Sequence, residues 1–252
     1  MSIFAKIFIQ PMNCGIVIIP TYNEIENIES IIRAVFSLHK PFHVLIVDDN
    51  SPDKTAEKVK ELQKEFPESL YIEEREKKSG LGTAYVHGFK WALQRNYEYI
   101  FEMDADFSHN PNDLERLYEV CHFDTADLAI GSRYVTGVNV VNWPLSRVLL
   151  SYFASVYVRK ITGMKIMDAT AGFICYRRQV LESINLDKIK FIGYAFQIEM
   201  KYRVFAKQFN IQEVPVIFTD RTKGQSKMSG AIIKEAVFGV LSLRIKKLFN
   251  TL

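Results

Sequence analysis

The chain has 252 residues, of which 48% are hydrophobic, enough to bury the core of one large α/β domain or two small ones. Its 32 basic and 29 acidic residues leave a net charge of +3, which excludes a surface built throughout to bind nucleic acid. The three cysteines lie far apart and form no CxxC pair, so neither a disulfide framework nor a zinc site is expected.

Apolar runs alternate with helical patterns through the first half of the chain. Ser51 followed by Pro52 is a favourable helix-starting pair, which predicts that the second helix begins there. The repeated strand–helix order predicts an α/β fold with a mostly parallel central sheet and helices on both faces. Strands are predicted at 15–20, 43–49, 70–74, 99–106 and 127–134, and helices at 23–38, 51–66, 82–95 and 111–122.

This alternation stops after about residue 135. Helices are predicted at about 145–162 and 194–209, and strands at 171–178 and 211–220. With no repeat or flexible linker, we expect one catalytic domain over residues 1–230. Residues 231–252 are predicted to form a C-terminal amphipathic helix, which either lies at a membrane interface or packs on the domain. The uncharged apolar stretches at 148–158 and 236–243 are shorter than the roughly 20 residues that a membrane-spanning helix needs.

Three predicted strands of the first half end in polar sequences: PTYNE (20–24), VDDNSPD (47–53) and MDADFSHNP (103–111). Parallel strands bring their carboxyl ends to one edge of the sheet, where ligands bind. Several carboxylates at one edge repel each other unless a cation lies among them, and Mg²⁺ or Mn²⁺ prefers such oxygen ligands. In an extended segment Asp104 and Asp106 point the same way, so the pair can hold one ion and its bound diphosphate.

Other functions fit parts of this pattern. A phospho-acceptor receiver domain would carry the two acids on its first strand, but here a strand–helix unit precedes them. A dinucleotide-binding fold would suit the GxG of 79–89, yet Tyr85 stands where its third glycine belongs. A non-enzymatic module that binds a nucleotide sugar for a partner protein is the third alternative, and it predicts donor binding without turnover.

Taken together, several strings resemble a known family. They are IIPTYNE, IVDDNSPDKT, GLGTAYVHGF, MDADFSHNP, GSRYVTG, ATAGF and FTDRTKGQSKMS. In this order, from about residue 15 to 230, they resemble the polyprenyl (dolichyl) phosphate mannose synthases. These are inverting glycosyltransferases with the Rossmann-like A-type fold. The resemblance implies GDP-mannose as donor, a divalent metal, and a polyprenyl phosphate acceptor. A related transferase that uses UDP-glucose or another nucleotide sugar is the alternative.

The resemblance also implies the residues that bind the donor. Metal ligands are expected at Asp104 and Asp106, with Ser108 completing the shell. Asp48 and Asp49 are expected near the base and ribose, with the choice between them open. The expected donor-binding set is Pro20, Tyr22, Glu24, Asp48, Asp49, Lys78, Gly82, Asp104, Ala105, Asp106, Arg221 and Lys227.

The acceptor side follows from phosphate chemistry. Arg133 ends a predicted strand, Arg147 and Ser151 share one helix face at i and i+4, and Arg221 follows FTD. Guanidinium groups bind phosphate in a bidentate manner, and these four positions match phosphate-binding positions of the family. With Asp104 and Asp106, they form the expected catalytic set. Asp168 and Glu199 are expected either to orient an arginine or to pack structurally.

The resemblance places the protein on the cytoplasmic face of a membrane, as a peripheral protein. Its acceptor is insoluble in water, so the protein has to meet a bilayer surface. Either the C-terminal helix or a membrane-anchoring partner protein could provide that contact, and no nucleic-acid partner is expected.

Overall fold

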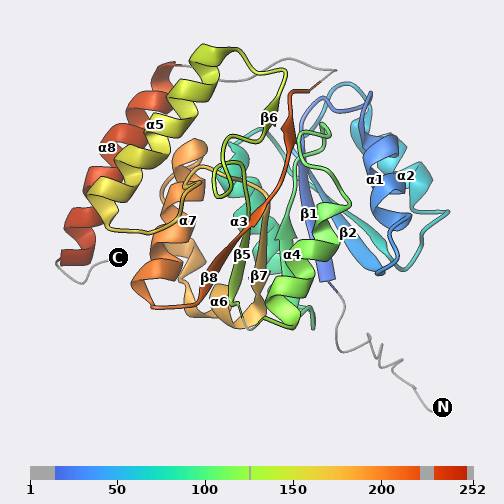
Figure 1. Ribbon diagram of the computed structural model, residues 1–252. Coiled ribbons are helices and arrows are strands. Elements are labelled where there is room, and N and C mark those ends of the chain that lie inside the picture. Colours follow the sequence, from blue (N-terminus) through green and yellow to red (C-terminus); the bar gives the residue numbers. More distant parts are fainter. Residues whose placement is uncertain (1–14, 125, 222–229, 249–252) are drawn as a thin grey trace.

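A seven-stranded sheet forms the centre of the protein (Figure 1). The computed structural model describes residues 15–124, 126–221 and 230–248. The strand order is β3-β2-β1-β4-β7-β5-β8. Only β7 runs against its neighbours β4 and β5, which confirms the mostly parallel sheet. The strands are β1 (Gly15–Thr21), β2 (Phe42–Asp48), β3 (Leu70–Glu74), β4 (Tyr99–Glu102), β5 (Leu128–Ser132), β7 (Ile174–Arg177) and β8 (Ile211–Pro215).

Helices cover both faces of this sheet, as predicted. A small second sheet pairs β6 (Val140–Val141) with β9 (Phe218–Thr219). The helical segments are α1 (Ile28–Phe36), α2 (Thr55–Leu62), α3 (Leu81–Leu93), α4 (Asp113–His122), α5 (Leu145–Thr162), α6 (Arg178–Ser183), the 3₁₀ turn η1 (Leu186–Lys188), α7 (Tyr194–Ala206) and α8 (Gly230–Leu248).

The two faces of the sheet have separate cores, because alternate strand residues point to opposite sides. In β1, Ile16 and Ile18 pack in the core under α3, α6 and α7, whereas Val17 and Ile19 pack under α1, α2 and α4. On the first face α3 lies very close to β1, since a Cβ at Gly88 would be 2.6 Å from a side-chain carbon of Ile18.

Helices α5 and α8 pack together outside α7, on the α3 side of the sheet (Figure 1). Their contact includes a hydrogen bond from the Tyr157 hydroxyl to the carbonyl of Val237 (3.0 Å). Helix α8 carries apolar side chains on both its buried and its exposed side, so its described side chains form no polar face of the kind that an amphipathic helix has. Val240 and Leu243 are buried, whereas Phe238 and Ile245 are exposed. Among the described residues, no helix is both long and apolar enough to cross a membrane.

Two predicted helix starts are wrong. Helix α1 begins at Ile28, not at residue 23. Helix α2 begins at Thr55, not at Ser51–Pro52. Ser51 instead closes a turn on Asp48, which accepts hydrogen bonds from the Ser51 amide (2.8 Å) and hydroxyl (2.6 Å). The N-cap residue is Lys54, and Asp53 just before it accepts hydrogen bonds from both the amide and the hydroxyl of Thr55. The Ser51–Pro52 pair therefore does not start the helix, because Ser51 binds Asp48, and Asp53, two residues further on, binds Thr55.

Candidate active site

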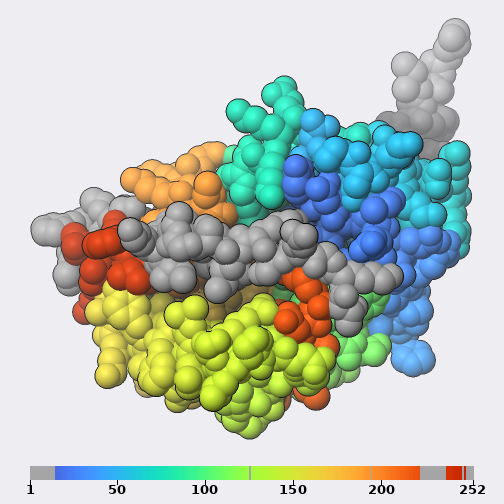
Figure 2. All heavy atoms as spheres, turned by 90° about the horizontal axis from the view of Figure 1, so that it is seen from above, coloured from blue at the N-terminus to red at the C-terminus, as the bar shows by residue number. Residues whose placement is uncertain are grey.

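The carboxyl ends of β1, β2 and β4 meet at one edge of the sheet, because these three strands are neighbours. Just beyond each strand one residue adopts a left-handed backbone: Asn23 (φ 58°), Asn50 (φ 56°) and Phe107 (φ 60°). Asparagine tolerates this conformation, but a phenylalanine in it is an outlier. Figure 2 looks down on this end of the molecule, with blue residues from the N-terminal part of the described chain on one side and yellow-green residues from around the start of α5 on the other.

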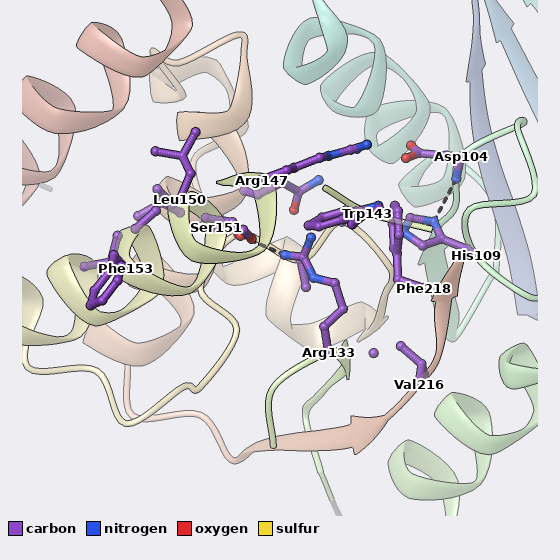
Figure 3. Close-up of a pocket in the computed structure, with 18 of the residues that line it drawn as sticks. Asp104, His109, Arg133, Trp143, Arg147, Leu150, Ser151, Phe153, Val216 and Phe218 are labelled. Carbon is purple, nitrogen blue, oxygen red and sulfur yellow. Dashed lines mark hydrogen bonds between the residues drawn. The ribbon is translucent and has the colours of Figure 1, made fainter. Parts of the chain in front are cut away.

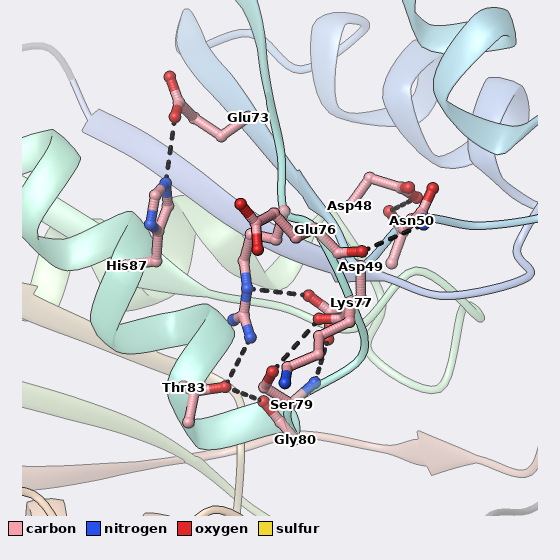
Figure 4. Close-up of polar contacts among 12 residues, drawn as sticks. Asp48, Asp49, Asn50, Glu73, Glu76, Lys77, Ser79, Gly80, Thr83 and His87 are labelled. Atoms are coloured by element: carbon pink, nitrogen blue, oxygen red, sulfur yellow. Dashed lines mark hydrogen bonds and ion pairs between the residues drawn. The ribbon is translucent and has the colours of Figure 1, made fainter.

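The two acids that end β2 have different roles. Asp48 is fully buried and accepts hydrogen bonds from the hydroxyls of Thr21 (2.7 Å) and Ser51, so it holds the turn. Asp49 lies 3.1 Å from the Arg75 guanidinium and accepts from the Ser79 amide at 3.3 Å (Figure 4). Burial raises the pKa of Asp49, and Arg75 partly offsets that shift. Asp49 thus pairs with Arg75, whereas Asp48 holds the turn, and a contact of either acid with the donor stays a prediction.

Arg75 is a candidate donor residue that the sequence reading missed. Besides Asp49, its guanidinium donates to the Thr83 hydroxyl (2.8 Å), and its Nη1 is buried without a partner among the described residues. It directly follows β3, so the same strand-end rule would have pointed to it. Nearby, the Lys78 ammonium lies 4.2 Å from the centre of the Tyr22 ring, which brings two predicted donor residues together.

Other predicted donor residues have structural roles as well. The Gly82 amide donates to the Ile192 carbonyl (2.9 Å), and a Cβ there would be 2.8 Å from the Phe196 ring. Gly82 is therefore needed for packing, and its amide is already used; the expected donor contact of Gly82 stays a prediction. Glu24 accepts from the Asn27 side chain (3.0 Å) at the entry to α1, and Pro20 lies within β1.

Asp104 and Asp106 lie in the loop that follows β4, because the strand ends at Glu102 and not at residue 106 as predicted. Burial and then the charge of Asp106 raise the pKa of Asp104 to about 7, although Arg221 opposes this shift. Asp106 is held by the Ser108 amide (3.0 Å) and by the Arg221 guanidinium (3.1 Å). Ser108 and Ala105 are buried.

His109 positions the Asp104 segment instead of titrating near neutral pH. Burial lowers its pKa to about 4, and its Nδ1 accepts a hydrogen bond from the Asp104 amide (3.2 Å). The imidazole also stacks on Phe173, with 4.8 Å between ring centres. A neutral ring with Nδ1 occupied and the ring packed is poorly suited to act as a base.

Asp104, Asp106 and Ser108 offer oxygen ligands that fit a divalent ion. Burial first and then the charge of Asp106 raise the pKa of Asp104, and a cation there would relieve the repulsion between the two carboxylates. Within the described residues no group of three or more His, Cys, Asp or Glu gathers at one point. The chain thus offers two carboxylates and the nearby Ser108, and such a site leaves positions for diphosphate oxygens and water, as Mg²⁺ prefers.

A cavity of about 380 Å³ extends from Asp104 to the α5–α8 pair (Figure 3). Its polar end contains four predicted residues beside Asp104: Arg133, Arg147, Ser151 and Arg221. The opposite wall is apolar and comes from α5, α7 and α8, with Leu150, Phe153, Ala154, Val158, Ile198, Val237 and Val240. Residues as far apart in the sequence as Arg133 and Arg221 thus meet at one site.

Arg133 is the most firmly held of the three arginines. Its Nε and Nη2 bind the two carboxylate oxygens of Asp168 (2.6 and 2.7 Å), and Nη2 also reaches the Thr170 hydroxyl (2.8 Å). Burial alone would raise the pKa of Asp168, but Arg133 outweighs it and holds that pKa below its usual range. Asp168 therefore orients an arginine, one of its two expected roles. Ser151 points toward Arg133 in Figure 3.

Arg147 and Arg221 are held by carboxylates at the same end of the cavity. Arg147 binds Asp220 (2.8 Å) and lies over the Trp143 ring, 4.0 Å from its centre. Arg221 binds Asp106. Asp220 was not predicted, because a partner 73 residues away leaves no local pattern. Lys227, expected to bind the donor, lies outside the described residues. Glu199 orients Arg203 (2.7 Å), which is not among the arginines of this cavity.

Comparison with known proteins agrees with this geometry. Residues 16–184 match the model of the family described as glycosyl transferase family 2. The chain is 46% identical over 238 residues to a polyprenol monophosphomannose synthase of Mycolicibacterium smegmatis, covering 94% of this chain and 89% of that protein. It is 45% identical over 223 residues to an undecaprenyl-phosphate mannosyltransferase of Micrococcus luteus, covering 88% and 90%.

Among solved structures, glucosyl-3-phosphoglycerate synthase from Mycobacterium tuberculosis, in complex with Mn²⁺, UDP and glucosyl-3-phosphoglycerate, aligns with a TM-score of 0.68. The alignment covers 92% of this chain and 80% of that one at 17% identity, so it shows the shared A-type fold alone. The predicted fold class is therefore confirmed, as is the resemblance to the polyprenyl phosphate mannose synthases. The chain belongs to glycosyl transferase family 2.

Proposed function

We propose that this protein transfers mannose from GDP-mannose to a polyprenyl phosphate with inversion, giving polyprenyl phosphate β-mannose and GDP. The observation that carries the proposal is the 380 Å³ cavity, which has three arginines at one end and an apolar wall at the other. A lipid phosphate has this pairing of anion and hydrocarbon. The names of the two curated relatives, one for a polyprenol monophosphomannose synthase and one for an undecaprenyl-phosphate mannosyltransferase, support it.

The chain's own residues supply binding and orientation. Arg133, Arg147 and Arg221 hold the acceptor phosphate, whose second pKa is about 6, so that it is largely dianionic near neutrality. A phosphate oxygen can then attack the anomeric carbon without a protein base, in keeping with the neutral and occupied His109. The new bond forms from that oxygen to C1 as the bond from C1 to the diphosphate oxygen breaks, and GDP leaves with the electron pair.

Asp104 and Asp106, with Ser108 nearby, would hold a divalent metal on the donor side. Mg²⁺ or Mn²⁺ bound there would supply charge neutralisation for the departing diphosphate. Asp49, Arg75 and the Lys78–Tyr22 pair are placed to hold the nucleotide. Two anions, the acceptor phosphate and the donor diphosphate, would thus lie close together, each beside its own cationic groups.

The apolar wall of the cavity continues onto the surface of α5 and α8. Leu145, Leu149 and Phe153 follow one another at i+4 on α5, and Leu145 and Phe153 are 71% and 61% exposed. On α8, Phe238 is 70% exposed. We infer that this surface of α5 and α8 lies on the cytoplasmic face of a membrane, where the acceptor resides. Of the predicted C-terminal segment 231–252, residues 249–252 lie outside the described residues. A membrane-anchoring partner protein remains the alternative means of attachment.

A donor panel tests the function. The protein is incubated with Mg²⁺, a polyprenyl phosphate and one nucleotide sugar at a time, including GDP-mannose and UDP-glucose, and the lipid products are separated by mass. GDP-mannose is expected to give a mannosyl phosphate lipid with the β configuration. A product from UDP-glucose instead would reassign the donor. Absence of any glycosylated lipid across the panel would refute the enzyme proposal, and donor binding without turnover would favour a binding module.

A further inference from the structure

Gln197, near the start of α7, lines the active-site cavity and has no role in the proposed mechanism so far. The residue is only 2% exposed. Its Nε2 donates to a carboxylate oxygen of Glu102, whereas its Oε1 has no hydrogen-bond partner in the part of the chain that the structure describes. Leaving a buried acceptor unpaired is costly, so an unpaired acceptor beside a cavity indicates a ligand group that donates to it.

Glu102 determines which way the Gln197 amide points. Its carboxylate is fully buried and accepts at both oxygens, from the Tyr176 hydroxyl (2.8 Å) and from Gln197 Nε2. The amide nitrogen therefore faces Glu102, and the amide oxygen is directed away from it. The backbone is held as well, because the Lys201 ammonium donates to the carbonyls of Gln197 (3.3 Å) and Ala171. The unpaired oxygen is thus fixed in place before any substrate binds.

Gln197 lies between the donor side and the acceptor side of the cavity. Its carboxylate partner is the last residue of β4, two residues before the proposed metal ligand Asp104. Gly172 lies on the other side, since a Cβ built on it would be 3.5 Å from Gln197 Nε2. Two residues before this glycine, the Thr170 hydroxyl binds Arg133 (2.8 Å). A sugar that passes from the diphosphate to the acceptor phosphate has to occupy this interval.

Hydrogen-bond chemistry selects the substrate group that Oε1 can contact. An amide oxygen accepts and cannot donate. The oxygens of the dianionic acceptor phosphate and of the donor diphosphate also only accept, and the polyprenyl chain has no polar hydrogen. The base and ribose carry donors, but the diphosphate separates them from this interval. The hydroxyls of the transferred sugar are the donors that remain.

We propose that Gln197 Oε1 accepts a hydrogen bond from one hydroxyl of the transferred sugar and so contributes to donor selection, with Glu102 as the positioning residue. The inference rests on the proposed function, because it requires a nucleotide sugar in this cavity. A site that pairs a buried acceptor with a substrate hydroxyl discriminates strongly against an analogue that lacks this hydroxyl, since the acceptor is then left unpaired.

The test compares GDP-mannose with deoxy donors that each lack one mannose hydroxyl, in transfer to a short, water-soluble prenyl phosphate. In the wild type, one deoxy donor should have a kcat/KM about 10- to 100-fold below that of GDP-mannose. Gln197→Met, which has similar length but no amide, should lose about the same factor with GDP-mannose and little more with that deoxy donor. The matched control is Gln179→Met on α6, an exposed glutamine whose Nε2 also donates to a carboxylate, that of Asp127. It should keep the wild-type ratio for every donor.

Glu102→Gln tests the same contact without changing Gln197. The new side-chain oxygen would accept from Tyr176, and the new nitrogen would face Gln197. The Gln197 amide would then turn round to accept from this nitrogen, and its own nitrogen would be directed to the sugar. This variant should lose the preference for the same hydroxyl that Gln197→Met loses. A purely structural role would instead lower transfer from all donors by one common factor.

A common factor for all donors in both variants would therefore overturn the proposal. So would a wild type that loses no more than about threefold with any deoxy donor, whether or not the variants fold. Calorimetric titration with GDP-mannose and the deoxy donors, in the presence of Mg²⁺, separates this inference from the proposed function. If the wild type forms no mannosyl lipid, the proposed function fails, and a binding preference for one hydroxyl that Gln197→Met abolishes would still support the contact. Equal binding of all donors by the wild type would overturn it.

Discussion

Replacing Asp168 should reveal how much the protein depends on a buried ion pair at the acceptor end of the cavity. The Asp168 carboxylate is fully buried and binds Arg133 through three donors: Nε (2.6 Å), Nη2 (2.7 Å) and the backbone amide (3.0 Å). In Asp168→Asn the shape is kept, but the negative charge is lost and an amide group faces the guanidinium. Arg133 itself is buried, so its charge would be left without compensation.

Removing one partner of a buried pair costs about 3–5 kcal/mol. For a chain of this size that corresponds to a fall of the melting temperature by about 6–20 °C. The assay is reversible denaturation by urea, followed by circular dichroism, with the thermal midpoint as a second readout. The matched control is Asp220→Asn, which breaks the more exposed pair with Arg147 and should cost at most about 1 kcal/mol.

The pH dependence of the unfolding free energy tests the same ion pair independently. The folded-state pKa of Asp168 is lowered, since Arg133 outweighs the effect of burial. The stabilisation is therefore fully present above the unfolded-state pKa, near 4, and is lost as the pH falls through the folded value. The gap between wild type and Asp168→Asn should shrink below about pH 4. Equal stability of Asp168→Asn and Asp220→Asn at pH 7 would refute the reasoning.

Three further changes test the sheet edge and the α3 contact. Asp106→Ala should abolish glycosyl transfer, since it removes a proposed metal ligand; unchanged turnover would contradict that role. Arg221→Gln should weaken acceptor binding yet raise the affinity for Mn²⁺ about fivefold in calorimetric titration, because it removes a cation that binds Asp106; a lower Mn²⁺ affinity would contradict this. Gly88→Ala should lower the unfolding free energy by about 1–3 kcal/mol, because its Cβ would meet Ile18; a more stable variant would show that α3 can shift.

Much of the donor side could be predicted from local sequence. An apolar run that ends in acids marks a buried strand and its carboxyl end, and neighbouring parallel strands then bring such ends together. Asp104 and Asp106 were found in this way. The division of labour between Asp48 and Asp49 was not, because it depends on Thr21, Ser51 and Arg75, whose side chains meet these acids only in the folded chain.

The acceptor side depended on the resemblance for its arginines and on the tertiary structure for their partners. Asp220 binds Arg147 across 73 residues, and Asp168 binds Arg133 across 35. Gly82 looked like part of a nucleotide-binding loop, yet it is packed under Phe196. No periodicity or spacing reports contacts of this kind.

Alternation of apolar and polar residues along a strand or helix is a short-range property, so the sequence by itself determined the α/β class, the strand ends and the acids that follow them. Which arginine each carboxylate holds, which side chains bind Asp48 and Asp49, and how α5 and α8 enclose an apolar wall were decided only by tertiary structure. The physical reason is that the role of a charged or apolar side chain depends on the neighbours that folding brings to it. Once such a side chain is buried, the identity of its neighbour decides whether its burial stabilises or destabilises the fold.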